Sequence, residues 1–157
     1  MSRTKVMAVA SAGGHWVQLL RLRPVWKDMD VTYVSTDPGL NAMLMEKCGT
    51  ESSWRFFSVV EANRETKRLL VLQLFQLFRI VRSTRPDVIV TTGAAPGYFA
   101  IRIGKLLGAR TIWVDSIANA EELSLSGEQV GNHADLWLTQ WSHLARPDGP
   151  EYRGSVI

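Results

Sequence analysis

The chain has 157 residues, enough for one domain with a hydrophobic core and short for two. Hydrophobic residues make up 46% and charged residues 21%, which excludes an intrinsically disordered chain. The single cysteine, Cys48, excludes an internal disulfide and argues against a structural zinc site, and we expect no metal and no other cofactor. The net charge of +3 suits an anionic partner without selecting nucleic acid, a membrane surface or a small anion.

Strand and helix signals alternate along the chain. Several strand candidates are continuous apolar runs, as in parallel strands that are covered on both faces. The strand candidates are 5–10, 31–35, 54–60, 87–92, 110–115 and 135–140, and the helix candidates are 14–22, 38–48, 65–84 and 97–107. This alternation predicts one α/β domain over residues 1–157, a doubly wound, mainly parallel, Rossmann-like sheet that binds ligands at the carboxyl ends of its strands. The apolar run at 6–10 is too short for a signal peptide or a membrane anchor.

Residues 11–15 (SAGGH) are the most informative segment of the chain. They join a predicted strand to a predicted helix. The glycines let the backbone approach a phosphate, and the helix N-terminus supplies free N–H groups and partial positive charge. His15 adds a group that titrates near neutral pH. The alternative is a tight turn with a solvated histidine, because the spacing matches neither the Rossmann fingerprint nor the P-loop.

Two further segments are expected at the same edge of the sheet. Residues 92–97 (TGAAPG) also leave a strand and enter a helix, so their backbone can approach a ligand closely. Residues 115–127 follow the next strand and begin with Asp115 and Ser116. Each segment alone is also typical of an ordinary loop. Together, two glycine-containing loops on neighbouring strand ends would form a site lined by N–H donors.

His15 and Asp115 are the candidate catalytic pair if the fold brings them together. At the end of a strand, Asp115 would orient a sugar hydroxyl, assist a base or cap the next helix, and capping is the commoner role. Ser124, Ser126 and Gly127 would supply further hydrogen bonds to a ligand or form a turn. The sequence contains neither a G-x-S-x-G nucleophile elbow nor an H-E-x-x-H motif.

The helix at 65–84 carries more apolar residues than one buried face requires. On a helical wheel, the predicted core-facing arc consists of Leu70, Val71, Leu74, Phe75, Leu77, Phe78 and Val81. The opposite arc contains Leu69, Leu72 and Ile80, with basic residues such as Arg68 and Arg79 around it. The apolar stretch is too short to span a bilayer, so we expect it to lie against lipid headgroups or a partner. The alternative is a helix buried between the sheet and a neighbour.

Six segments together carry a resemblance to a known family. They are 11–15, 92–97, 112–116, 123–127, 134–141 and 152–157. In their order and spacing the chain resembles the acceptor-binding, membrane-associated subunit of split GT-B glycosyltransferases. That family includes the small subunit of the eukaryotic UDP-N-acetylglucosamine transferase acting on dolichol-pyrophosphate sugars, and bacterial relatives in exopolysaccharide synthesis. The chain is more distantly similar to the N-terminal half of the peptidoglycan lipid-intermediate glycosyltransferase.

The resemblance implies one half of a GT-B fold, which binds a polyprenyl-pyrophosphate-linked sugar while a separate chain binds the UDP-sugar. His15 would be the general base for the attacking hydroxyl, without a covalent enzyme intermediate. Asp115 stands where family members often carry glutamate. The acceptor site would be lined by Ser11, Gly13, Gly14, His15, Gly93, Ala94, Ser116, Ser124, Ser126 and Gly127.

The resemblance also implies a peripheral protein on the cytoplasmic face of a membrane. The eukaryotic subunit has an N-terminal membrane anchor that this sequence lacks, and the chain stops where a fused enzyme would continue into a donor domain. Membrane or partner contact would therefore fall to the helix at 65–84. Its contact residues would be Leu69, Leu72, Ile80, Arg68 and Arg79. The tail 152–157 would dock the donor-binding chain.

The main alternative is a self-contained soluble α/β enzyme or binding protein for a phosphate-bearing small molecule. Against it, Asp37 is the only acidic residue placed to bind a ribose, and it resembles a helix cap. A membrane-recruitment scaffold without a catalytic role is a third hypothesis. Nucleic-acid binding is disfavoured, because the positive charge lies mainly around one apolar helix, without interleaved stacking residues.

Overall fold

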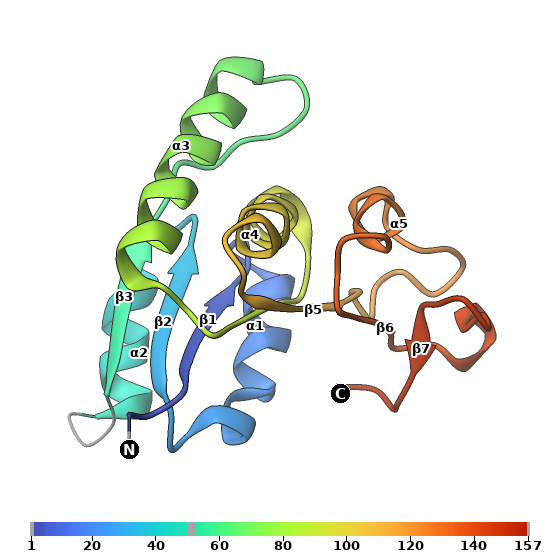
Figure 1. The fold of residues 1–157 in the computed structure, drawn as a ribbon, viewed down its shortest axis with the longest axis horizontal. Helices are drawn as coiled ribbons and strands as arrows, with labels where there is room; N and C mark the ends of the chain where they lie inside the picture. Colours follow the sequence, from blue (N-terminus) through green and yellow to red (C-terminus); the bar gives the residue numbers. More distant parts are fainter. Residues whose placement is uncertain (1, 50–52, 157) are drawn as a thin grey trace.

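The computed structural model describes residues 2–49 and 53–156, and its centre is a parallel sheet (Figure 1). The sheet has seven strands in the order β3-β2-β1-β4-β5-β6-β7. The strands are β1 (Lys5–Val9), β2 (Asp30–Ser35), β3 (Trp54–Ser58), β4 (Val88–Thr91), β5 (Arg110–Val114), β6 (Leu136–Thr139) and β7 (Glu151–Tyr152). The helices are α1 (Gly14–Arg21), α2 (Leu40–Cys48), α3 (Lys67–Thr84), α4 (Ala94–Leu106) and α5 (Leu125–Val130), with short 3-10 turns η1 (Arg23–Trp26) and η2 (Ser142–Leu144). The predicted doubly wound α/β class is confirmed.

The central strand β1 is covered on both faces. Met7 and Val9 pack into one core cluster with side chains of α3 and α4, whereas Val6 and Ala8 pack into a second cluster with side chains of α1 and α2. All four side chains are buried, as the alternation of side chains along a strand requires. This two-sided covering explains why β1 is a continuous apolar run rather than an alternating one.

The predicted elements lie close to their expected bounds, with three differences. Helix α4 begins at Ala94 rather than at residue 97, because Pro96 fits within its first turn. The structure adds α5 and β7, which were not predicted. Both are too short to show a hydrophobic period, and β7 pairs only through its two residues with β6.

The buried face of α3 differs from the predicted arc. Gln73 is buried, as Leu77 is. The side-chain amides of Gln73 and Gln76 form hydrogen bonds with the backbone that follows β3. Gln73 Nε2 donates to the carbonyl of Val60 at 2.7 Å, and Gln76 Oε1 accepts from the Val60 N–H at 2.9 Å. Buried backbone groups need hydrogen-bond partners. The side of α3 that carries these two glutamines therefore faces the protein interior. Ile80 is partly buried and packs against the core on the same side, so it does not lie opposite the core as expected, and its predicted contact with a membrane or partner stays a prediction.

The outer face of α3 is exposed, so within the described residues no neighbouring element buries the helix against the sheet. Four members of the predicted core-facing arc lie there instead of in the core: Val71, Leu74, Phe75 and Phe78. Leu69 and Leu72 are exposed as predicted, and the guanidinium carbon of Arg79 lies 5.9 Å from the centre of the Phe75 ring.

Asp135 ties the start of β6 to β5 and α4. Its Oδ2 accepts from the Thr111 N–H at 2.9 Å and from the Thr111 hydroxyl at 3.1 Å, and its Oδ1 pairs with Lys105. The hydrogen bond from Lys105 has the largest effect on this carboxyl and lowers its pKa; partial burial opposes it, and the bonds from Thr111 lower the pKa further.

We expect Asp135→Asn to lower the free energy of unfolding at neutral pH. A carboxyl whose pKa is depressed in the folded state stabilises the fold above its unfolded-state pKa, and this stabilisation is lost as the pH falls through the folded-state pKa. The difference between wild type and variant should therefore shrink on acidification. Urea unfolding at a series of pH values measures it, and a difference that stays constant into the acid range would contradict this role.

Candidate active site

Two reciprocal hydrogen bonds join the starts of α1 and α4. His15 Nδ1 lies 2.9 Å from the carbonyl oxygen of Thr92, and the Thr92 hydroxyl donates to the carbonyl of His15 at 2.6 Å. The helices begin at Gly14 and Ala94, each after a short loop that follows one of the neighbouring strands β1 and β4. The order of connections reverses between these two strands, which is where ligands bind in doubly wound sheets. Two partially positive helix ends therefore adjoin at this switch point.

The contact with Thr92 fixes the tautomer of His15. A carbonyl oxygen can only accept, so Nδ1 must carry the hydrogen. In the neutral ring Nε2 is then unprotonated and can take a proton. Among the residues that the structure describes, no hydrogen bond engages Nε2 of His15, and the ring is only partly buried. A histidine held through Nδ1 in this way keeps Nε2 available to accept a proton, which is the geometry that a general base requires.

Gly93 leaves room for the His15 ring. Its φ of +128° lies in the region that favours glycine, and a Cβ there would lie 2.9 Å from Cε1 of His15 and 3.0 Å from Nδ1. The next residue, Ala94, also has a positive φ of 66°. Because these conformations cost energy in residues other than glycine, the loop is held in shape by its surroundings.

We expect Gly93→Ala to displace the His15 ring as well as strain the backbone. The variant should unfold about 1–3 kcal/mol more easily and lose the hydrogen bond between His15 and Thr92. NMR of the imidazole nitrogens would show the lost Nδ1–H anchor. The matched control is Gly14→Ala, because a Cβ at Gly14 meets no atom within 4 Å. An unchanged His15 signal in Gly93→Ala would contradict the steric argument.

Asp115 is a buried anchor rather than a free carboxylate. The residue is 1% exposed, and both carboxylate oxygens accept hydrogen bonds. The donors are the Trp113 indole at 3.1 Å, the Ser124 hydroxyl at 2.6 Å, the Asn119 amide at 3.1 Å and the Ser124 N–H at 3.0 Å. These bonds tie the end of β5 to the start of α5. Among the described residues no hydrogen bond joins Asp115 to His15, and the partner of the His15 ring is the Thr92 carbonyl instead.

Ser124 and Gly127 complete this anchor. The Ser124 hydroxyl accepts from the Gly127 N–H at 2.9 Å and thereby caps α5. A Cβ on Gly127 would lie 2.4 Å from Oδ1 of Asp115. Ser124 and Gly127 therefore hold the loop, and their predicted contact with acceptor stays a prediction. Ser126 is partly buried, with no hydrogen bond of its side chain among the described residues.

A buried pair of glutamines connects the site to the C-terminal tail. Gln18 Nε2 donates to the Ser116 hydroxyl at 3.0 Å, and Gln18 Oε1 accepts from the Ile117 N–H at 3.0 Å and from Gln140 Nε2 at 2.7 Å. Gln140 Nε2 also donates to the carbonyl of Asp115 at 2.9 Å, and its Oε1 accepts from the Val156 N–H at 2.7 Å. The expected meeting of the three segments is thus confirmed, although through Gln18 and Gln140, whose roles were not predicted.

We expect Asp115→Asn to act on stability more than on chemistry. An asparagine amide has a single acceptor oxygen, so the donors that face its NH2 group lose their acceptor. A buried donor left without a partner costs about 1–3 kcal/mol. Chemical denaturation measures this loss, and activity per folded molecule should stay near that of wild type. A fully folded variant without activity would instead support the catalytic role predicted for Asp115.

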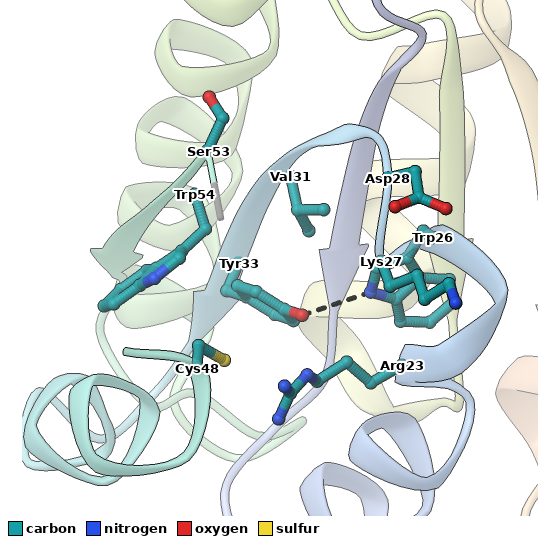
Figure 2. A pocket seen from close by; sticks show the side chains of 9 residues that line it. All are labelled: Arg23, Trp26, Lys27, Asp28, Val31, Tyr33, Cys48, Ser53 and Trp54. Atoms are coloured by element: carbon teal, nitrogen blue, oxygen red, sulfur yellow. Dashed lines mark hydrogen bonds between the residues drawn. The ribbon is translucent and has the colours of Figure 1, made fainter. Parts of the chain in front are cut away.

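A hollow of about 280 Å³ lies around Tyr33, at the amino ends of β2 and β3 (Figure 2). The Trp26 indole donates to the Tyr33 hydroxyl at 3.1 Å, and burial raises the pKa of that phenol. Arg23 donates to the carbonyl of Lys47 at 3.1 Å. Since this hollow lies away from the carboxyl ends of the strands, the switch point remains the stronger candidate site.

The fold defines the class of the protein. The structure resembles MurG from Acinetobacter baumannii with a TM-score of 0.74 at 13% identity, and the match covers 97% of this chain and 45% of that one. It also resembles UDP-N-acetylglucosamine 2-epimerase from Rickettsia bellii, with a TM-score of 0.66 at 14% identity over 90% of this chain and 40% of that one. The chain thus has the Rossmann-like fold of one half of a GT-B protein and spans less than half the length of these structures.

The sequence identifies the family within this class. The family described as "Oligosaccharide biosynthesis protein Alg14 like" matches residues 6–156, and the chain belongs to it. Two relatives are named UDP-N-acetylglucosamine transferase subunit ALG14. The protein from Yarrowia lipolytica is 25% identical over 99% of this chain and 82% of its own length. The protein from Eremothecium gossypii is 27% identical over 90% of this chain and 74% of its own length. The predicted family is confirmed.

Membrane association was also expected from the sequence. In the part of the chain that the structure describes, no helix is both long enough and apolar enough to cross a bilayer.

Proposed function

We propose that this chain is the acceptor-binding subunit of a two-chain glycosyltransferase. Its substrate would be a polyprenyl-pyrophosphate-linked sugar, and the donor would be UDP-N-acetylglucosamine held by a separate chain. The observation that carries the proposal is the junction of His15 with Thr92, which places two helix N-termini and one basic nitrogen at a switch point. Family membership favours this function over a self-contained binding protein for a small phosphate compound.

In this proposal the pyrophosphate of the acceptor binds at the starts of α1 and α4. The loop at 11–14 and the residues Gly93 and Ala94 offer backbone that a phosphate can approach closely. Anionic oxygens there are favoured by the first-turn N–H groups and the helix dipoles. Ser11, Gly13 and Gly14 would thus bind the acceptor directly, whereas Ser116 acts through its bond with Gln18.

His15 would then remove one proton from the attacking hydroxyl. Nε2 accepts that proton while Nδ1 keeps its hydrogen bond to Thr92, which stabilises the imidazolium formed. The hydroxyl oxygen forms a bond to the anomeric carbon of the donor sugar, and the bond from that carbon to the UDP oxygen breaks. UDP leaves with the electron pair, and no covalent enzyme intermediate forms. Asp115 positions the loop at 116–124 and does not touch the reacting atoms.

The same proposal gives the outer face of α3 to the membrane. The exposed apolar side chains of α3 and the neighbouring Arg68 and Arg79 suit a helix that rests on lipid headgroups. We place the protein peripherally, on the cytoplasmic face. The tail 152–156 would contact the donor-binding chain; Ile157, the last residue of the predicted tail, lies outside the described residues. Because Gln140 holds Val156, a partner bound to this tail would adjoin the site.

We expect His15→Asn to abolish transfer while preserving the loop. The asparagine amide can still donate to the Thr92 carbonyl, but it offers no basic nitrogen. Loss of a general base typically costs about 10²–10⁴-fold in rate. The measurement is sugar transfer from UDP-N-acetylglucosamine to a short-chain polyprenyl-pyrophosphate sugar, by this chain together with the donor-binding chain of the same host.

The matched control for His15→Asn is His133→Asn, because no side-chain hydrogen bond of His133 occurs among the described residues. This variant should transfer at the wild-type rate. Full activity of His15→Asn would contradict the catalytic role and favour a recruitment scaffold. A wild-type pair that transfers no sugar to any such acceptor would contradict the proposed function itself.

A further inference from the structure

A groove of about 670 Å³ lies at the amino edge of the sheet, away from the candidate active site. It runs between the C-terminal ends of α3 and α4 and the starts of β4 and β5. Phe78, Val88 and Leu107 give it apolar walls. Three arginines also line it, namely Arg82, Arg85 and Arg110.

The three arginines of this groove are only partly neutralised by the protein, because a single carboxylate lines it with them. Asp87 is the acidic residue that lines the groove, and its Oδ2 already accepts a hydrogen bond from the backbone N–H of Lys5 at 2.8 Å. Within residues 2–49 and 53–156, no ion pair engages Arg82, Arg85 or Arg110. The groove therefore combines apolar walls with an excess of positive charge, and favours a ligand that is apolar in one part and anionic in another.

The groove continues the exposed face of α3. Val71, Leu74, Phe75 and Phe78 follow the spacing i, i+3, i+4, i+7 and form one stripe, which we call the outer stripe. These side chains are 67%, 39%, 57% and 38% exposed. Phe78 belongs both to the outer stripe and to the groove, so an apolar surface leads from the helix into the arginine cluster. Figure 1 shows α3 (green) along one side of the molecule, with its first turns extending beyond the sheet.

We propose that the groove binds one anionic phospholipid of the membrane on which α3 rests. The phosphate would lie between Arg82 and Arg110, whose planar guanidinium groups suit bidentate contact with its oxygens. The first part of an acyl chain would lie against Phe78 and Leu107. This inference rests on the membrane contact proposed for α3, and it adds a defined lipid site to that contact. Two other ligands fit the groove less well. An apolar peptide would leave the guanidinium groups without an anionic partner, and free phosphate would leave the apolar walls exposed to water.

The test uses a lipid that is soluble without a bilayer. Binding of dihexanoyl phosphatidylglycerol to the full chain is measured by titration calorimetry, with inorganic phosphate and dihexanoyl phosphatidylcholine as comparison ligands. The variant Arg82→Gln/Arg110→Gln should weaken binding of the anionic lipid at least about tenfold, since two charge-assisted contacts are lost. The control Arg146→Gln/Arg153→Gln makes the same change of charge in two exposed ion pairs far from the groove and should bind like wild type.

A variant that preserves the charge distinguishes a defined lipid site from nonspecific attraction by positive charge. Arg82→Lys/Arg110→Lys keeps the net charge but loses the bidentate geometry, so its binding should still weaken several-fold. Equal binding by this variant and wild type, or equal binding of inorganic phosphate and the anionic lipid, would overturn the lipid site. Vesicles of phosphatidylcholine with one quarter phosphatidylglycerol test the membrane contact separately. Failure to bind these vesicles, with the soluble lipid still bound, would remove the contact of α3 and with it the proposed membrane source of the ligand.

Discussion

The hydrogen bonds between His15 and Thr92 are the constraint on which the candidate site depends. They join two loops that leave neighbouring strands toward opposite faces of the sheet. They also fix the tautomer of His15. The same bonds therefore hold the two loops together and leave Nε2 of the neutral ring unprotonated. The surrounding residues support this contact between the two loops. Gly93 leaves space for the ring, and the Asp115 and Gln18 networks hold the third loop beside it.

The fold was largely predictable because apolar runs and glycine turns report local structure. β1 is apolar from Val6 to Val9, so its burial on both faces was predictable from the sequence. The buried face of α3 was not predictable. Two of its glutamines face inward and form hydrogen bonds with the backbone of Val60, and the hydrophobic period of a helix does not reveal such a contact. The segments of the site were likewise predictable from their glycines, but the link through Gln18 and Gln140 was not. A buried amide pair depends on tertiary placement, and a glutamine in a sequence is more often on the surface.

The two ends of the sheet carry different chemistry. The carboxyl edge offers helix N-termini, backbone N–H groups and one histidine, which suits a pyrophosphate with a hydroxyl to be activated. The amino edge offers arginines on apolar walls beside the outer stripe of α3, which suits an anionic amphiphile. A lipid-linked substrate must be bound while its polyprenyl chain stays in a bilayer. A protein that holds the membrane along α3 and the acceptor headgroup at the switch point would meet both demands.

The most direct test of the central claim is NMR of the chain labelled with ¹⁵N, titrated with a short-chain prenyl-pyrophosphate sugar. We predict that the amides of Gly14, His15 and Ala94 shift together, and that His15 keeps a protonated Nδ1 while Nε2 responds to the ligand. An acceptor analogue that binds without moving these amides, or a His15 ring protonated only at Nε2 in the free protein, would contradict the site described here.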